Sequence, residues 1–173
     1  MNTHHRRRID VVLDAEFVDG LGDLPIDQLR DRRVLTDEVE VELSYHRRLL
    51  HGRLDLLDFE LRRRRGEESR SLIEALPEIL TGSDTTGGGR GSQVRGGFAP
   101  EIPAVTGRRD IDRVLEDTFL AELPATGDDE LLAIRDLMAE AERNVSDARR
   151  QVHDVHDRIV AAIADRYAGD RSD

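Results

Sequence analysis

The amino-acid sequence predicts an all-α protein in which two long helices pair as a coiled coil, with short flanking helices and a flexible Gly-rich connection. Two long stretches carry apolar residues at helical spacing, and the alternation typical of strands is almost absent. A segment rich in glycine and proline separates the two stretches. With 173 residues, 3% aromatic residues and no tryptophan, the chain has the length of one domain with a modest core. This argues against a large enzyme fold.

The predicted elements divide the chain into four segments. These are a short helical N-terminal segment (1–35), a first long helix (36–66), short helices with a flexible Gly/Pro-rich connection (67–125) and a second long helix (126–169). Within the third segment, eight of the fourteen glycines lie between residues 81 and 108. Short amphipathic pieces flank this glycine-rich stretch at 68–80, interrupted by Pro77, and at 109–120.

Capping and breaking residues define where the long helices are expected to begin and end. The expected limits are Thr36 or Asp37 and Gly66 for the first helix, and Thr126 and Gly169 for the second. Glu40 would complete a capping box in the first helix, and Asp129 in the second. Gly52 lies inside the first helix, where it either leaves room for a close partner or is a tolerated cost of about 1 kcal/mol.

Charge and composition exclude several classes of protein. The 26 basic residues are all arginine and stand against 37 acidic ones, so the net charge is −11, which argues against direct binding of DNA or RNA. The absence of cysteine excludes disulfides and thiolate metal sites. The longest apolar run, 159–164, is far shorter than the roughly 20 residues of a membrane helix. We therefore expect a cytoplasmic protein without a membrane partner.

The most specific signal is an internal repeat at an offset of 102 residues. Six polar residues of the first helix recur in the second: Glu40, Ser44, Arg47, Arg48, His51 and Asp55 recur as Glu142, Ser146, Arg149, Arg150, His153 and Asp157. At about 100° per residue, all six lie on one face of each helix. We call this face the polar strip. The windows 40–57 and 142–159 each hold equal numbers of acids and arginines, so the acidic excess lies elsewhere.

An apolar seam runs beside the polar strip on both helices. Its predicted members are Leu43, Leu50, Leu54, Leu57 and Leu61 on the first helix, and Ile134, Met138, Val145, Val152, Ile159 and Ile163 on the second. If the two seams pair the helices, the two polar strips border a common groove.

Two interpretations of the polar strips were weighed. One is a solvated coiled-coil rim laced with salt bridges. A rim, however, has no reason to repeat a serine and a histidine among its charges. The other is a nucleotide site, because arginine can bind the O6/N7 edge of guanine or a phosphate, and carboxylates accept from the guanine N1–H and N2–H₂ donors. Serine and histidine suit phosphate oxygens and 2′-hydroxyls. Two such strips in antiparallel helices would match a two-fold ligand, a cyclic dinucleotide or a stacked pair of them.

The spacing E-xxx-S-xx-R-xxx-H-xxx-D in both helices resembles the signature of the RsiG family, the cyclic-di-GMP-dependent anti-sigma factors of actinobacteria. The family has glutamine at the fourth position, where this chain has His51 and His153. The resemblance extends to residues 24–30, 52–55 and 76–80 and to the closing Arg166-Tyr167. The connection 66–125 is long enough for either helix direction, and the resemblance implies an antiparallel two-helix coiled-coil hairpin.

The resemblance also implies the function and its residues. Family members bind a pair of cyclic-di-GMP molecules and in that state sequester WhiG, a flagellar-type sporulation sigma factor, from RNA polymerase. The implied ligand contacts are Glu40, Ser44, Arg47, His51 and Asp55 with Glu142, Ser146, Arg149, His153 and Asp157. Neighbouring Arg48 and Arg150 are candidates for phosphate contacts, with an ordinary rim role as the alternative.

Two other functions remain as alternatives. A structural helical hairpin would scaffold another protein through its apolar surfaces without a nucleotide. A metal-dependent enzyme would use His153, His156 and Asp157, or the pair His46 and His51, yet the Glu-x-x-His pattern of di-iron bundles is missing. Because no nucleophile–base–acid set is present, we expect a protein that is not an enzyme and has no cofactor or metal.

Overall fold

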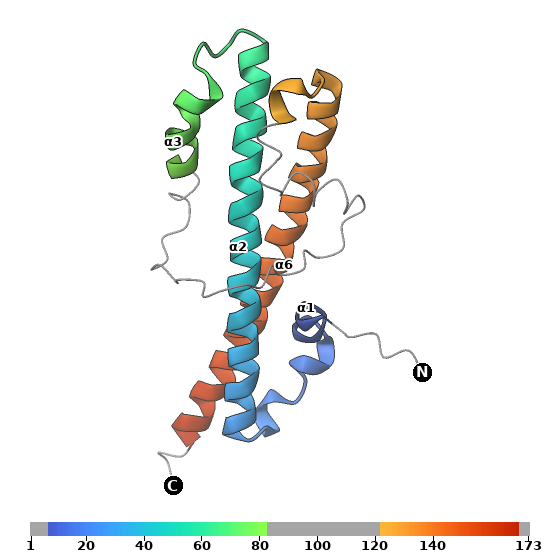
Figure 1. The fold of residues 1–173 in the computed structure, drawn as a ribbon. Helices are drawn as coiled ribbons and strands as arrows, with labels where there is room; N and C mark the ends of the chain where they lie inside the picture. Colours follow the sequence, from blue (N-terminus) through green and yellow to red (C-terminus); the bar gives the residue numbers. More distant parts are fainter. Residues whose placement is uncertain (1–6, 83–121, 170–173) are drawn as a thin grey trace, which may run out of the picture. The chain divides into compact units, whose positions relative to one another are not determined.

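The computed structural model describes residues 7–82 and 122–169, and all regular elements in these ranges are helical (Figure 1). They are α1 (Arg8–Val12), the 3₁₀ turns η1 (Ala15–Phe17) and η2 (Leu21–Asp23), α2 (Ile26–Arg64), α3 (Leu72–Gly82), the 3₁₀ turn η3 (Leu123–Ala125) and α6 (Asp128–Gly169). This confirms the all-α class. Most of the expected Gly-rich connection and the piece at 109–120 fall outside the described residues. None of the described helices is long and apolar enough to cross a membrane.

Helix α2 begins ten residues earlier than the sequence predicted, so the expected start at Thr36 or Asp37 is wrong. It follows Pro25 directly, and the Pro25 carbonyl accepts the Leu29 N–H at 3.2 Å. No helix breaker lies between Ile26 and Thr36. The Thr36 hydroxyl is buried and donates to the Arg32 carbonyl at 2.8 Å, one turn earlier in the same helix. Thr36 therefore satisfies its hydroxyl inside the helix instead of capping one.

Gly66 ends α2 as predicted. Its φ of 77° is in the left-handed region. The Gly66 N–H donates to the Arg63 carbonyl and the Glu67 N–H to the Arg62 carbonyl, each at 3.0 Å. These two bonds form a Schellman motif, in which a left-handed residue satisfies carbonyls that the last turn leaves open.

The other two helices begin at different kinds of caps. Ser71 and Glu74 form a reciprocal capping box at the start of α3, with the Ser71 N–H donating to Glu74 at 2.7 Å and the Glu74 N–H to the Ser71 hydroxyl at 3.3 Å. Helix α3 continues through Pro77, so the expected interruption there is wrong. Helix α6 begins at Asp128, two residues after the expected start at Thr126. The Gly127 carbonyl accepts the Leu131 N–H at 2.9 Å. Thr126 instead donates its hydroxyl to the Glu122 carbonyl at 3.0 Å.

The chain divides into two compact units, and each contains a paired portion of α2 and α6. The first unit comprises Met1–Ser44 and Ser146–Asp173, and the second Tyr45–Val145. In both units the two helices are antiparallel, because residues further along α2 contact residues nearer the start of α6. The first unit shows this in Arg30–Tyr167 (2.6 Å) and Glu40–Arg149 (3.0 Å), and the second in His51–Glu142 (2.9 Å), Asp58–Arg135 (2.7 Å) and Arg64–Asp128 (2.6 Å). The antiparallel helix pair is confirmed.

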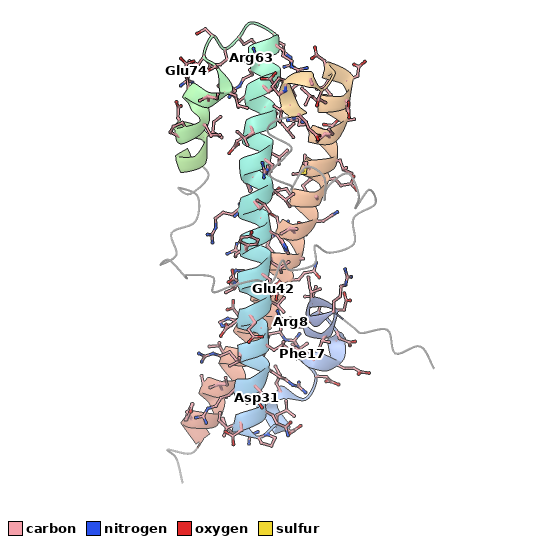
Figure 2. The ribbon with its side chains drawn as sticks, viewed as in Figure 1. Arg8, Phe17, Asp31, Glu42, Arg63 and Glu74 are labelled. Atoms are coloured by element: carbon pink, nitrogen blue, oxygen red, sulfur yellow. The ribbon has the colours of Figure 1, made fainter. Side chains whose placement is uncertain are left out.

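The first unit joins the N-terminal segment to α2 and α6. Its buried apolar residues are Val12, Leu21, Leu29, Val39 and Leu43 with Ala148, Val152, Val155 and Ile159. Arg8 pairs with Glu38 at 2.8 Å and contacts Glu42 (Figure 2). Arg32 donates to the Phe17 carbonyl at 2.5 Å and lies 5.3 Å from the centre of the Phe17 ring. These contacts hold the segment before α2 against the helix pair.

The second unit joins α3 and the η3 turn to the helix pair. Its buried apolar residues are Leu50, Leu56, Leu57, Phe59, Leu61, Ala75, Leu123, Leu131, Met138, Ala141 and Val145. The Glu60 carboxylate, only 2% exposed, accepts from Arg63 at 2.8 Å and from Arg64 at 2.7 Å. Arg64 also donates to the carbonyls of Leu123 and Thr126 at 2.8 and 2.7 Å. The Glu60–Arg64 pair thus fastens the turn before α6 onto α2.

Alanine substitution of Gly52 within α2 and of Gly66 at its end should change the free energy of unfolding in opposite directions. Gly52 has helical backbone and no atom within 4 Å of an added Cβ, so Gly52→Ala should raise the free energy of unfolding by up to about 1 kcal/mol. Gly66→Ala should lower it by about 1–2 kcal/mol, because its left-handed φ is strained for any residue with a Cβ. Urea denaturation followed by circular dichroism measures both. If both substitutions raised the free energy of unfolding, or both lowered it, this account of the helix end would be wrong.

The stability contribution of Glu60 should depend on pH. Hydrogen bonds from Arg63, and then from Arg64, hold the pKa of its carboxyl below its ordinary value, although burial opposes this. A lowered folded-state pKa means that the contribution is complete at neutral pH and is lost as the pH falls through that pKa. Glu60→Gln should therefore cost about 1–3 kcal/mol of unfolding free energy at neutral pH and much less in acid, by urea denaturation.

Glu38→Gln is the matched control for Glu60→Gln, because Glu38 is an exposed glutamate of the same helix paired with Arg8. Its effect should stay below about 0.5 kcal/mol. Equal losses of unfolding free energy in the two variants would show that the burial of Glu60 adds nothing to stability.

Candidate ligand-binding site

Residues of both motif copies meet in the first unit. The Glu40 carboxylate oxygen Oε1 accepts the Ser44 hydroxyl at 2.8 Å and Arg149 Nε at 3.0 Å, and His153 Nε2 lies 3.5 Å from it. Arg149 Nε also donates to the Ser44 hydroxyl at 2.9 Å. We call these four residues the first-unit cluster. It joins two motif residues of α2 to two of α6.

A second meeting of both motif copies occurs in the second unit. Glu142 Oε1 lies 2.9 Å from His51 Nε2 and 3.4 Å from Arg47 Nε. Because a carboxylate only accepts, His51 must carry a proton on Nε2 in this contact. We call Arg47, His51 and Glu142 the second-unit cluster.

The two clusters have the same chemistry with the helices exchanged. In the first unit, α2 supplies the glutamate and α6 the arginine and histidine. In the second unit, α6 supplies the glutamate and α2 the arginine and histidine. The repeat offset converts Glu40–Arg149 into Arg47–Glu142, and Glu40–His153 into His51–Glu142. The sequence alone did not predict these cross-helix pairs, since they depend on the direction and register of the helix pairing.

Comparison with protein families supports the resemblance that the motif predicted. Residues 15–80 match the model of a family described as RsiG-like. Over this segment, the chain is similar to the RsiG-like family. The matched segment contains the first motif copy, Glu40 to Asp55, and stops before the second. The family suggests a regulatory role of the anti-sigma type, exercised on a protein partner. No curated protein matches the chain.

The clusters of this RsiG-like chain are open to solvent but shaped by the helices. The glutamate side chains are the most enclosed, at 17% exposed for Glu142 and 27% for Glu40. The arginine and histidine side chains are between 33% and 45% exposed. Each carboxylate therefore sits at the base of its cluster, with flexible donors above it that an entering molecule could reach.

The aspartates of the motif lie outside both clusters. Asp157 is exposed, and its carboxylate lies 3.4 Å from His156 Nδ1. Asp55 lines a groove instead. Partial burial there raises the pKa of the Asp55 carboxyl; His51 opposes this and Asp58 adds to it.

The motif positions that remain are Ser146, Arg150 and Arg48. Ser146 is half-buried on α6. Arg150 is exposed and pairs with Asp147 on its own helix. Arg48 is exposed and forms no ion pair with any residue in the ranges 7–82 and 122–169.

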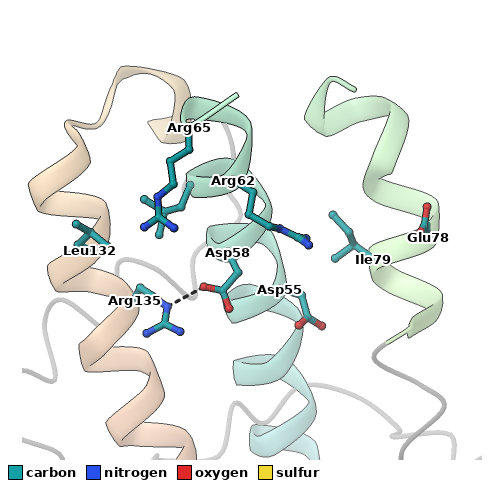
Figure 3. Close-up of a pocket in the computed structure, with 9 residues that line it drawn as sticks. Asp55, Asp58, Arg62, Arg65, Glu78, Ile79, Leu132 and Arg135 are labelled. Carbon is teal, nitrogen blue, oxygen red and sulfur yellow. Dashed lines mark hydrogen bonds and ion pairs between the residues drawn. The ribbon is translucent and has the colours of Figure 1, made fainter. Parts of the chain in front are cut away.

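The groove at Asp55 extends the polar face of α2 in the second unit (Figure 3). It has a volume of about 800 Å³ and is lined by Asp55, Asp58, Leu61, Arg62 and Arg65 of α2, Leu132 and Arg135 of α6, and Glu78 and Ile79 of α3. Arg135 donates to Asp58 at 2.7 Å. Apart from Asp55, these residues lie outside the repeated motif, so no pattern in the sequence marks them as ligand-binding residues.

A contact between a histidine and an aspartate was also not predicted from the sequence. His156 Nε2 lies 3.3 Å from the Asp37 carboxylate in the first unit. The repeat equivalents of these two residues are Leu54 and Ala139, so no repeated pattern marks them. His46 is only 4% exposed, and its ring centre lies 5.9 Å from that of Tyr45, with the two ring planes tilted by 57°. Among the described residues, no three histidine, aspartate or glutamate side chains gather to hold a metal ion.

Removing the negative charge of either cluster should have little effect on folding. Glu40→Gln and Glu142→Gln should each lower the free energy of unfolding by less than about 1 kcal/mol, because their ion pairs are partly exposed. Urea denaturation measures this. A loss above about 2 kcal/mol would show that the clusters exist to hold the helices together.

Proposed function

We propose that the chain is an anti-sigma factor that binds a pair of cyclic-di-GMP molecules through its two clusters and then sequesters a flagellar-type sigma factor of the WhiG class. The RsiG-like family match suggests an anti-sigma type of regulation. The ligand is supported by one observation above all. The repeated motif residues converge into two clusters, each with a carboxylate acceptor opposed by an arginine and a histidine.

Each cluster offers what guanine requires. Arginine can donate to guanine O6 and N7, and glutamate can accept from N1–H and N2–H₂. In the structure these two groups pair with each other, at 3.4 Å between Arg47 and Glu142 and 3.0 Å between Arg149 and Glu40. A guanine that enters between the arginine and the glutamate would replace their ion pair with contacts to two edges of the base.

The energies favour this exchange. A partly exposed ion pair contributes about 0–1 kcal/mol, so little is lost when the two side chains separate. A bidentate arginine contact to guanine contributes about 1–3 kcal/mol of discrimination. The ion pair between arginine and glutamate therefore keeps both recognition groups in place without competing strongly with the ligand.

Both clusters set a glutamate against an arginine and a histidine, so each is a separate guanine site. A pair of cyclic-di-GMP molecules repeats the same base edges and can supply a guanine to each site. We propose no catalysis, cofactor or resident metal: the clusters contain donors and acceptors for recognition, and their histidines and carboxylates face one another rather than a nucleophile. The sigma factor would bind only the ligand-filled chain, which makes the messenger the switch.

Arginine removal tests the ligand assignment. In calorimetric titration of the full chain with cyclic-di-GMP, Arg47→Ala and Arg149→Ala should each weaken binding by about 1–3 kcal/mol. Arg143→Ala is the matched control, an exposed arginine of α6 next to Glu142 but outside the polar strip, and should bind as the wild type does. Cyclic-di-AMP should bind far more weakly, since adenine lacks both O6 and the N2 amine.

The same titrations, repeated with the cognate sigma factor present, separate the competing functions. No heat with cyclic-di-GMP, either alone or with the sigma factor, would overturn the proposal. Partner binding that occurs without nucleotide, and that Arg47→Ala and Arg149→Ala leave unchanged, would instead support the structural scaffold.

A further inference from the structure

The groove of the second unit is bounded by three helices and lined mainly by charged side chains. Its base is α2, and its walls are α6 with Leu132 and α3 with Ile79 (Figure 3). Six of the nine lining residues are charged, whereas pockets for small molecules are mostly apolar and enclose their ligand. From Asp55 to Arg65 the base spans about 15 Å, the length of roughly three turns of a helix. The groove therefore suits a segment of a protein better than a small molecule.

Two arginines of the groove have no partner in the part of the chain that the structure describes. The side chains of Arg62 and Arg65 are exposed, and neither forms a hydrogen bond or ion pair with a residue in 7–82 or 122–169. Figure 3 shows Arg62 on the side of the groove toward α3 and Arg65 on the side toward α6. An acidic side chain placed in the groove at this level would lie between two guanidinium groups, which bind carboxylates well.

The acids of the groove are paired at one position and unpaired at another. Asp58 accepts from Arg135 at 2.7 Å, and Glu78 accepts from Arg70 at 2.7 Å. Asp55 forms no hydrogen bond or ion pair with any described residue. Partial burial raises the pKa of its carboxyl, so a nearby cation would stabilise the charged form. The groove thus offers an unpaired acid at one end and unpaired arginines at the other.

We propose that this groove is the docking site for one amphipathic α-helix of the protein partner, which places an acidic residue at Arg62 and Arg65 and a basic residue about two turns away at Asp55. This inference rests on the proposed function, because the partner is the sigma factor. It assigns the groove, which lies outside both clusters, to the partner and not to the nucleotide.

Apolar contacts would supply most of the affinity of the docked helix. Leu132 on α6 is 39% exposed, and Ile79 on the facing wall is half-buried. Leu61 lines the base between them and is buried. An amphipathic helix can cover all three with one apolar face. The charges at the two ends of the groove then determine its orientation, because exposed ion pairs give specificity more than affinity.

The groove adjoins the second-unit cluster along α2. His51 of that cluster precedes Asp55 by one turn of the helix, and the charge of a protonated His51 acts on the Asp55 carboxyl. A nucleotide in the cluster would therefore lie close to the basic residue that docks at Asp55. Attraction between the phosphates and this residue would make each binding event favour the other.

Charge reversal in the groove tests the contribution of its arginines. The full chain is saturated with cyclic-di-GMP and titrated with the cognate flagellar-type sigma factor. Arg62→Glu and Arg65→Glu should each weaken sigma-factor binding roughly fivefold to tenfold, because each replaces an attraction by a repulsion. Both variants should bind cyclic-di-GMP alone as the wild type does.

Arg143→Glu is the matched control for the two charge reversals. Arg143 is an exposed arginine of the same unit and lies outside the groove. The substitution changes the charge of the chain by the same amount, so it reports the effect of long-range electrostatics alone. It should weaken sigma-factor binding by less than about twofold.

Cross-linking identifies the occupant of the groove. The chain has no cysteine, so Leu132→Cys provides a single attachment site for a benzophenone label inside the groove. In the complex with cyclic-di-GMP and the sigma factor, the label should cross-link to a sigma-factor helix with an apolar stripe and with an acid and a base about two turns apart. Val160→Cys is the matched control, because Val160 is also 39% exposed on α6 but belongs to the first unit. Its label should not cross-link to that helix.

The outcomes separate this inference from the function on which it rests. Wild-type affinity for the sigma factor in both arginine variants overturns the inference alone. Cross-links from the groove to a second copy of the chain, to another part of the same chain or to a non-helical segment of the sigma factor do the same. An absence of sigma-factor binding to the wild type with cyclic-di-GMP present overturns the proposed function and the inference with it. The cross-links decide the question even if the charge variants fold poorly.

Discussion

The apolar seam on α2 and α6 is the constraint on which the candidate site depends. In each unit most of the seam is buried, with Leu43, Val152 and Ile159 in the first and Leu50, Leu57 and Val145 in the second. The predicted seam members Leu54, Ile134 and Ile163 are only half-buried. Burying apolar side chains is the dominant favourable term in folding, and it determines which faces of the helices meet. Because the polar strip lies directly beside the seam on both helices, burial of the seam also brings the polar strip of α2 close to that of α6. The site is therefore positioned by groups that never contact the ligand.

The direction of pairing determines what the polar strips do when they meet. A parallel pair in register would set like against like, with Glu40 beside Glu142 and Arg47 beside Arg149, and each contact would be repulsive. The antiparallel pair sets Glu40 against Arg149 and Glu142 against Arg47. When the two copies of the motif lie opposite each other, their charges complement each other in the antiparallel direction and repel in the parallel one. The order of charges within the motif contains this preference, although the hydrophobic pattern alone does not.

The charge of the whole chain and the charge of the clusters point to different partners. A net charge of −11 opposes binding of a nucleic acid, which presents a long array of phosphates. The clusters pair each glutamate with an arginine and a histidine, so a small anion there meets local donors and not the acidic surface. The ion pairs are partly exposed and individually weak, which leaves the donors available to a ligand while the helices keep them in place. Glu60 contrasts with this, since its enclosed carboxylate fastens Arg64 and the turn before α6.

Local chemistry in the sequence determined the all-α class, the seam, the end of α2 at Gly66 and the residue types of the strip. It misplaced the start of α2, because Thr36 has the chemistry of a cap but satisfies its hydroxyl within a longer helix. Only the tertiary structure decided which motif residues meet. It separated Asp55 and Asp157 from the clusters, and it paired His156 with Asp37 without any repeated signal. The reason is physical: helical periodicity specifies the face that a residue occupies, whereas the residue that it meets depends on the register of another helix far along the chain.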